Sequence, residues 1–176
     1  MANDPNKPLV NRVASSGLIT INLEEFFPKE PVAVFDLKDY LFMEMILKEK
    51  DFRIALKEHD WTQYQGKNLA VYCSTDAIIP VWAYMLVAAN AAPYAHMIFQ
   101  GDVDTFYKIA FQKALDAIEG SDYDQKRVVI KGCSSKPVPP SAYMELTRIL
   151  QPHVQSMMYG EPCSTVPVFK RPRKLK

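Results

Sequence analysis

Short apolar runs alternate with longer amphipathic stretches along this chain, and this alternation predicts its secondary structure. Residues 18–23 are apolar at every second position, which predicts a strand with one exposed face. Compact apolar runs bounded by Gly, Pro, Asn or Asp predict further strands, and a last extended segment predicts an edge. These strands are expected at 32–35, 69–73, 96–100, 127–131 and 154–159, with the edge at 165–170.

Helices are predicted between most of these strands. Asp36 is an N-cap residue for a helix through about residue 49, and residues 51–58 continue it as a second helical piece. The other helices are predicted at 76–91, 104–119 and 139–151. This succession of strands and helices predicts the α/β class, with three layers and a mainly parallel sheet that has helices on both faces.

Composition fits one folded domain. The chain has 176 residues, of which 48% are hydrophobic and 23% are charged. We therefore predict an irregular arm over residues 1–16, a single α/β domain over 17–170, and a basic tail over 171–176. The net charge of +1 creates no general field for polyanions, so we expect no nucleic-acid partner and interpret the tail as solvated.

The beginning of the chain and its cysteines predict a cytoplasmic location. Residues 1–8 are polar and show no secretory signal, and three cysteines without a close pair argue against a disulfide framework. The longest apolar stretch, 77–89, is too short to span a bilayer, so no membrane association is expected. We expect the helix at 76–91 to be buried in the domain or half-buried in a homodimer contact.

Each of the three cysteines begins the same kind of tripeptide, Cys-Ser-Ser or Cys-Ser-Thr. With ordinary usage of Ser and Thr, such a match follows a cysteine by chance in roughly one case in a hundred, and all three together in about one in a million. This repetition indicates selection on these loops. The tripeptides are Cys73-Ser74-Thr75, Cys133-Ser134-Ser135 and Cys163-Ser164-Thr165.

All three tripeptides follow the carboxyl end of a predicted strand. Loops from parallel strands leave a sheet at the same edge, where ligands bind in open α/β sheets. We therefore expect Cys73, Cys133 and Cys163 to converge there. Gly101, Gly132 and Gly160 fall at the same strand ends and allow tight turns or close approach to a ligand.

Three thiolates suit a metal or cluster site. Thiolates are ligands for zinc and for iron–sulfur clusters, and the hydroxyls and N–H groups that follow each cysteine suit donation to its sulfur. The predicted metal ligands are Cys73, Cys133 and Cys163, with Ser74, Thr75, Ser134, Ser135, Ser164 and Thr165 around the cofactor. Asp76, Asp102 and Glu161 lie on the same predicted edge and are candidates for a fourth ligand.

Two other interpretations stay open. In the first, the cysteines are inert core residues of a non-catalytic interaction or structural domain, and Ser or Thr caps the next helix. This explains Cys163 poorly, since no amphipathic helix follows it. In the second, one low-pKa cysteine, with Cys163 the first candidate, performs metal-free thiol chemistry on a small molecule. The sequence does not decide between an enzyme and a binding protein.

Other residue patterns add little. His59, His96 and His153 have no metal-ligand spacing and are interpreted as packing or surface residues. The chain contains no GxGxxG, GxxxxGK[ST], CxxC or GxSxG motif, so dinucleotide, P-loop and serine-hydrolase functions lack support.

Two segments of the sequence resemble a known protein family. Residues 68–89 (NLAVYCSTDAIIPVWAYMLVAA) and 160–170 (GEPCSTVPVFK) resemble an uncharacterised bacterial family, domain of unknown function 2480, and the likeness extends over most of the chain. The resemblance implies a small bacterial cytosolic protein. It implies no activity or site residues, because the family has none established.

Overall fold

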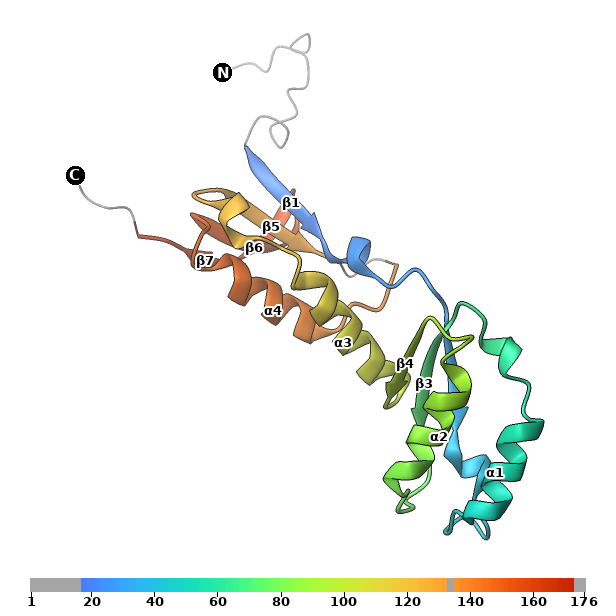
Figure 1. Ribbon diagram of the computed structural model, residues 1–176. Helices are drawn as coiled ribbons and strands as arrows, with labels where there is room; N and C mark the ends of the chain where they lie inside the picture. Colours follow the sequence, from blue (N-terminus) through green and yellow to red (C-terminus); the bar gives the residue numbers. More distant parts are fainter. Residues whose placement is uncertain (1–16, 133–134, 173–176) are drawn as a thin grey trace, which may run out of the picture. The chain divides into compact units, whose positions relative to one another are not determined.

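The computed structural model describes residues 17–132 and 135–172, which form two units (Figure 1). Unit 1 consists of residues 17–27 and 111–172, and unit 2 consists of residues 28–110 between them. The predicted arm (1–16) and residues 173–176 of the predicted tail lie outside the described residues. None of the described helices is long and apolar enough to cross a membrane.

Unit 2 contains a parallel three-stranded sheet in the order β2-β3-β4. Its strands are β2 (Val32–Asp36), β3 (Asn68–Tyr72) and β4 (Met97–Gln100). Helices α1 (Glu49–Glu58) and α2 (Val81–Ala91) pack on this sheet, and short 3-10 helices η2 (Leu37–Tyr40) and η3 (Trp61–Tyr64) complete the unit. The central strand β3 is the most buried of the three, as expected for a parallel strand flanked on both sides.

An aromatic cluster forms much of the unit 2 core. The ring of Phe35 is stacked with those of Tyr40 and Trp61, at centroid distances of 5.0 and 5.5 Å. His59 lies at the border of this cluster, with Nδ1 3.2 Å from the Tyr40 hydroxyl and Nε2 3.0 Å from the Tyr64 hydroxyl. Burial holds the pKa of His59 below its usual value, which fits the packing role expected from the sequence.

Unit 1 contains a four-stranded sheet in the order β1-β5-β6-β7. Strands β1 (Leu18–Asn22), β5 (Arg127–Lys131) and β6 (Ser156–Glu161) are parallel, whereas β7 (Ser164–Lys170) returns antiparallel to β6. Helix α4 (Pro140–Leu150) and the end of α3 (Val103–Leu115) pack on this sheet. The unit also has 3-10 helices η1 (Leu23–Phe26) and η4 (Gly120–Tyr123).

The two units repeat one fold. Each has the order strand, 3-10 helix, α-helix, 3-10 helix, strand, α-helix, strand, and each pairs its three parallel strands in the same register. Hydrogen bonds recur 59 residues apart: Gly66 N donates to Tyr94 O, and Gln125 N to His153 O, both at 3.0 Å. Gly66 and Gln125 also share a positive φ, of 69° and 57°. Among the described residues, β7 is the strand of unit 1 without a counterpart in unit 2.

The repeat is also visible in the residues. Both α2 and α4 begin in the phrase P-x-x-A-Y-M, at Pro80 and at Pro139. With one residue inserted before the second cysteine and one removed after it, the two copies align from η3 to the end of β4 and from η4 to the end of β6. Identical pairs include Tyr64/Tyr123, Lys67/Lys126, Cys73/Cys133, Ser74/Ser134, Ala83/Ala142, Tyr84/Tyr143, Met85/Met144, Pro93/Pro152 and Gly101/Gly160.

The α/β class with mainly parallel strands is confirmed, and every predicted strand is present. The expectation of one central sheet is wrong, because the strands form two sheets. The residues 17–170, predicted as a single domain, fall into the two units. The rhythm of strands and helices along a sequence does not reveal that one unit is inserted into another.

Two helices start later than predicted. The helix expected from Asp36 is only the 3-10 turn η2, because residues 42–46 form a tight bridge with Met43 and Glu44 at positive φ, and α1 begins at Glu49. The helix expected from residue 76 begins at Val81, directly after Pro80, whose ring suits the start of a helix and not its interior.

Candidate functional site: a pocket repeated in both units

An apolar pocket of about 580 Å³ lies in unit 1, between α4 and strands β5, β6 and β7. Three methionines contribute flexible apolar surface, and hydroxyls come from two tyrosines and one threonine. The Thr147 hydroxyl already donates its hydrogen to the Tyr143 carbonyl, at 2.7 Å. The lining residues are Ile130, Pro140, Tyr143, Met144, Thr147, Met157, Met158, Tyr159 and Val168.

Helical periodicity explains how α4 forms one wall of this pocket. Ala142, Leu146 and Leu150, at helical spacing, are buried in the unit 1 core. The positions beside them, Tyr143 and Met144, therefore face the pocket. Met144 is 75% exposed, so most of its apolar surface is open to a ligand in the pocket.

Unit 2 has a smaller pocket, of about 290 Å³, at the equivalent place between α2 and β4. Each of its lining positions corresponds to a lining position of the unit 1 pocket in the repeat alignment. The residue that the unit 1 pocket adds is Val168, from β7. The unit 2 pocket is lined by Val71, Val81, Tyr84, Met85, Ala88, Ile98, Phe99 and Gln100.

The Tyr-Met pair is the part of each pocket that the two copies share without change. Met85 and Met144 are mostly exposed, so core packing does not explain their identity. The next positions along each helix have diverged, from Leu86 to Glu145 and from Ala89 to Arg148. Retention of an exposed methionine on a helix that otherwise diverges indicates a role for these pocket walls.

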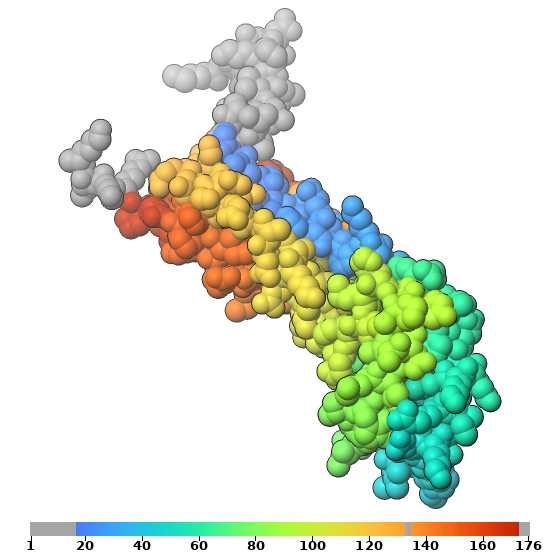
Figure 2. Space-filling model, in the orientation of Figure 1, coloured from blue at the N-terminus to red at the C-terminus, as the bar shows by residue number. Residues whose placement is uncertain are grey.

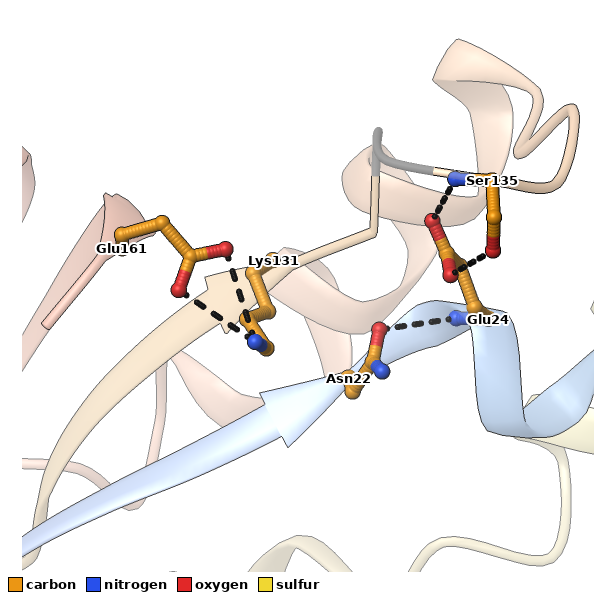
Figure 3. A network of polar contacts seen from close by, with 5 residues as sticks. All are labelled: Asn22, Glu24, Lys131, Ser135 and Glu161. Atoms are coloured by element: carbon orange, nitrogen blue, oxygen red, sulfur yellow. Dashed lines mark hydrogen bonds and ion pairs between the residues drawn. The ribbon is translucent and has the colours of Figure 1, made fainter.

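A polar network lies at the carboxyl edge of the unit 1 sheet (Figure 3). The buried Glu24 carboxylate, just after β1, accepts hydrogen bonds from the backbone N–H and the hydroxyl of Ser135, at 2.9 and 2.8 Å. Asn22 caps η1 by accepting from Glu24 N, and Lys131 pairs with Glu161 at 3.2 Å. This network joins the ends of β1, β5 and β6 and anchors the loop that follows β5.

In unit 2, the loop after β3 is also held by hydrogen bonds to a carboxylate. Asp36, at the end of β2, accepts from the backbone N–H groups of Ser74 and Lys38, at 3.0 and 2.9 Å. Burial raises the pKa of Asp36, but the hydrogen bonds from Ser74 and Lys38 outweigh it and hold this pKa below its usual value. In both units, a carboxylate at the end of the first strand or just after it thus fixes the loop after the middle strand.

The three cysteines fall in different parts of the chain. Cys73 follows β3 in unit 2 and is half-buried, whereas Cys163 is exposed in the turn between β6 and β7 of unit 1. Cys133 and Ser134 lie outside the described residues. Within the described ranges, no group of three or more His, Cys, Asp or Glu side chains is placed to hold a metal ion. The convergence of the three thiols therefore stays a prediction.

Several other predicted site residues have structural roles. Asp102 accepts from Thr105 N at 2.8 Å and so caps the start of α3, and Glu161 pairs with Lys131. Ser135 is bound to Glu24. Thr75 and Asp76 lie in the loop before α2, and Ser164 and Thr165 begin β7.

The repeat changes the meaning of the repeated tripeptides. Cys73-Ser74 and Cys133-Ser134 occupy equivalent positions of the two copies, so their likeness follows from duplication and the three loops are not independent. The chance of about one in a million holds only for independent loops and does not apply to these three. Cys163 is different, because it lies beyond the aligned part of the repeat, in the turn before β7, a strand that has no counterpart among the described strands of unit 2.

Sequence reasoning missed both the pockets and the buried Glu24. The repeated phrase P-x-x-A-Y-M was a signal for the pockets, because it places the same exposed Tyr-Met pair on two helices. Glu24 had no such signal, since its partner Ser135 lies 111 residues away in the chain.

These features define an α/β protein built from two copies of one unit, each with an apolar pocket beside its second α-helix. The family described as "Protein of unknown function (DUF2480)" matches residues 7–171, and the chain belongs to this family. No match is found among curated proteins or among solved structures.

Proposed function

We propose that the protein binds a small, largely apolar molecule in the unit 1 pocket. The observation that carries this proposal is the pocket itself: its volume of about 580 Å³ lies in the range typical of small-molecule sites, and its Tyr-Met wall is retained in both copies.

The lining residues indicate the class of ligand. Met144, Met157 and Met158 are flexible and polarizable, and such side chains adapt to ligands of several shapes. Burial of each 100 Å² of apolar ligand surface contributes about 2.5 kcal/mol before the cost of association. An aromatic or acyl group therefore suits the pocket better than a sugar or a nucleotide.

Replacement of Met144 by Glu tests this proposal. A carboxylate at this exposed position leaves the core intact but opposes burial of an apolar ligand, so the affinity for the fluorescent probe 1-anilinonaphthalene-8-sulfonate should fall at least tenfold, about 1.4 kcal/mol. Fluorescence titration measures the affinity, and the midpoint of thermal unfolding checks the fold.

Met85→Glu, at the equivalent position of unit 2, is the matched control. It should leave the affinity of the probe for the unit 1 pocket unchanged. Equal probe binding by the wild type and by Met144→Glu would exclude the unit 1 pocket. Loss of binding in both variants would show that the probe does not distinguish the two pockets and would contradict the assignment to unit 1.

We also propose, as a second function, that Cys73, Cys133 and Cys163 hold zinc or an iron–sulfur cluster. Cys163 favours this function because duplication does not account for it. The paired strands β5 and β6 favour it as well, since Cys133 and Cys163 follow the ends of these neighbours in sequence. Thiolates from separate loops are suitable ligands for either cofactor.

Anaerobic purification, followed by visible absorption and metal analysis, tests the second function. Each Cys→Ala change should lower the bound metal, whereas Ser121→Ala, an exposed position on η4, should not. Metal-free wild-type protein, or unchanged metal content in all three variants, would reject it. Rapid alkylation of Cys163 in metal-free protein would then favour thiol chemistry, and slow alkylation of all three a structural role.

A further inference from the structure

The outer edge of β4 in unit 2 has no partner strand among the described strands, whereas the equivalent edge of β6 in unit 1 is paired with β7. In unit 1, β7 pairs antiparallel with the outer edge of β6, from Glu161 opposite Ser164 to Ser156 opposite Lys170. In unit 2, the chain leaves the equivalent strand β4 at Gly101 and enters α3. Among the described strands, β4 pairs only with β3.

This edge lacks the features that keep edge strands apart. Residues 97–100, Met-Ile-Phe-Gln, contain no charge and no proline. The outermost strand of unit 1, by contrast, carries Pro167 and Lys170 on β7. An uncharged edge of this kind is a template for an additional strand.

The surface beside this edge is also apolar. Val81 and Met85 are 74% and 67% exposed and line the unit 2 pocket together with β4. The segment around residues 78–91, drawn in green, forms part of the visible surface of unit 2 (Figure 2). An added strand would therefore meet an apolar wall as well as free backbone groups.

We infer that β4 of a second copy of this chain adds to β4, giving a homodimer with a continuous six-stranded sheet. Antiparallel addition is the direction that β7 uses in unit 1, and it allows the same strand to serve both copies in a two-fold contact. A two-fold axis through the Phe99 position places Ile98 opposite Gln100, so no like charges face each other.

The second copy also completes the unit 2 pocket. In unit 1, β7 contributes Val168 to the pocket, and in the dimer an apolar residue of the added β4 takes this place. The contact buries Val81 and Met85, which agrees with the sequence-based expectation of a half-buried helix in a homodimer. This inference does not rest on ligand binding by unit 1.

The dimer is tested by Met85→Glu and Gln100→Lys, two exposed positions that line the unit 2 pocket beside β4, with Met144→Glu as the matched control in unit 1. Light scattering after size-exclusion chromatography should give about twice the 20.1 kDa chain mass for the wild type and the control. Both unit 2 variants should raise the dimer dissociation constant at least tenfold, because they bring like charges to the contact.

Amide hydrogen exchange provides an independent measurement. The β4 amides should be protected in the wild-type dimer and should exchange faster in Met85→Glu, while the β3 amides stay protected in both. A monomeric wild type would overturn the inference. A dimer that both unit 2 variants leave intact, or that Met144→Glu dissociates, would overturn it as well.

Discussion

Replacement of Phe35 by Ala should lower the free energy of unfolding by roughly 3–5 kcal/mol, the usual cost of removing a buried aromatic ring. Phe35 is 2% exposed and lies between the rings of Tyr40 and Trp61. Its removal leaves a cavity that two bulky, stacked neighbours cannot fill without leaving their own contacts. The ring of Phe35 also contacts that of His59, at a centroid distance of 5.3 Å.

Chemical denaturation monitored by tryptophan fluorescence measures this loss, since Trp61 is in direct contact with the deleted ring. Val34→Ala is the matched control: it is the adjacent residue of β2, points to the other face of the sheet and is 41% exposed. It should cost less than about 1 kcal/mol. Similar losses in the two variants would show that the aromatic cluster is not the centre of the unit 2 core.

Gly132→Ala should destabilise unit 1 by roughly 2–6 kcal/mol. Gly132 has φ of +151°, and a Cβ there would lie 2.8 Å from Leu23 Cβ and 3.2 Å from the Tyr143 hydroxyl. Backbone strain of about 1–3 kcal/mol adds to a steric clash of similar size. Because Tyr143 lines the unit 1 pocket, the substitution should also weaken binding of the fluorescent probe.

Gly66→Ala separates the cost of backbone strain from the cost of the steric clash. Gly66 also has a positive φ, of +69°, but an added Cβ would have no atom within 4 Å. Its cost should therefore be about 1 kcal/mol, from the backbone alone. Thermal and denaturant unfolding compare the two variants, and an equal loss in both would show that close packing around Gly132 contributes nothing.

The local part of the fold was predictable from the sequence, and the long-range part was not. The run at 127–131 coincides with β5, and that at 154–159 overlaps β6, because buried parallel strands are continuous apolar runs. Sheet membership depends on contacts such as Leu18 with Arg127, for which local periodicity contains no information. The expected single sheet failed for this reason.

Of the candidate site, the sequence predicted only the loops at the carboxyl edge of the strands, and not the pockets. The sequence located the loops after β3, β5 and β6, and the structure shows two of them anchored by carboxylates from Asp36 and Glu24. The pockets depend on the packing of one helix against the strands beside it. Exposed methionines such as Met144 resemble ordinary surface residues until the equivalent helix is recognised.

The insertion of unit 2 has a consequence for synthesis of the chain on the ribosome. All residues of unit 2 emerge before β5, the only described strand that pairs with β1. The β1 segment, residues 18–22, therefore stays unpaired while more than half of the chain is translated. Unit 2 has no such delay, because its strands and helices are contiguous. Early folding of unit 2 shortens the effective loop between β1 and β5 and so reduces the entropy lost when they pair.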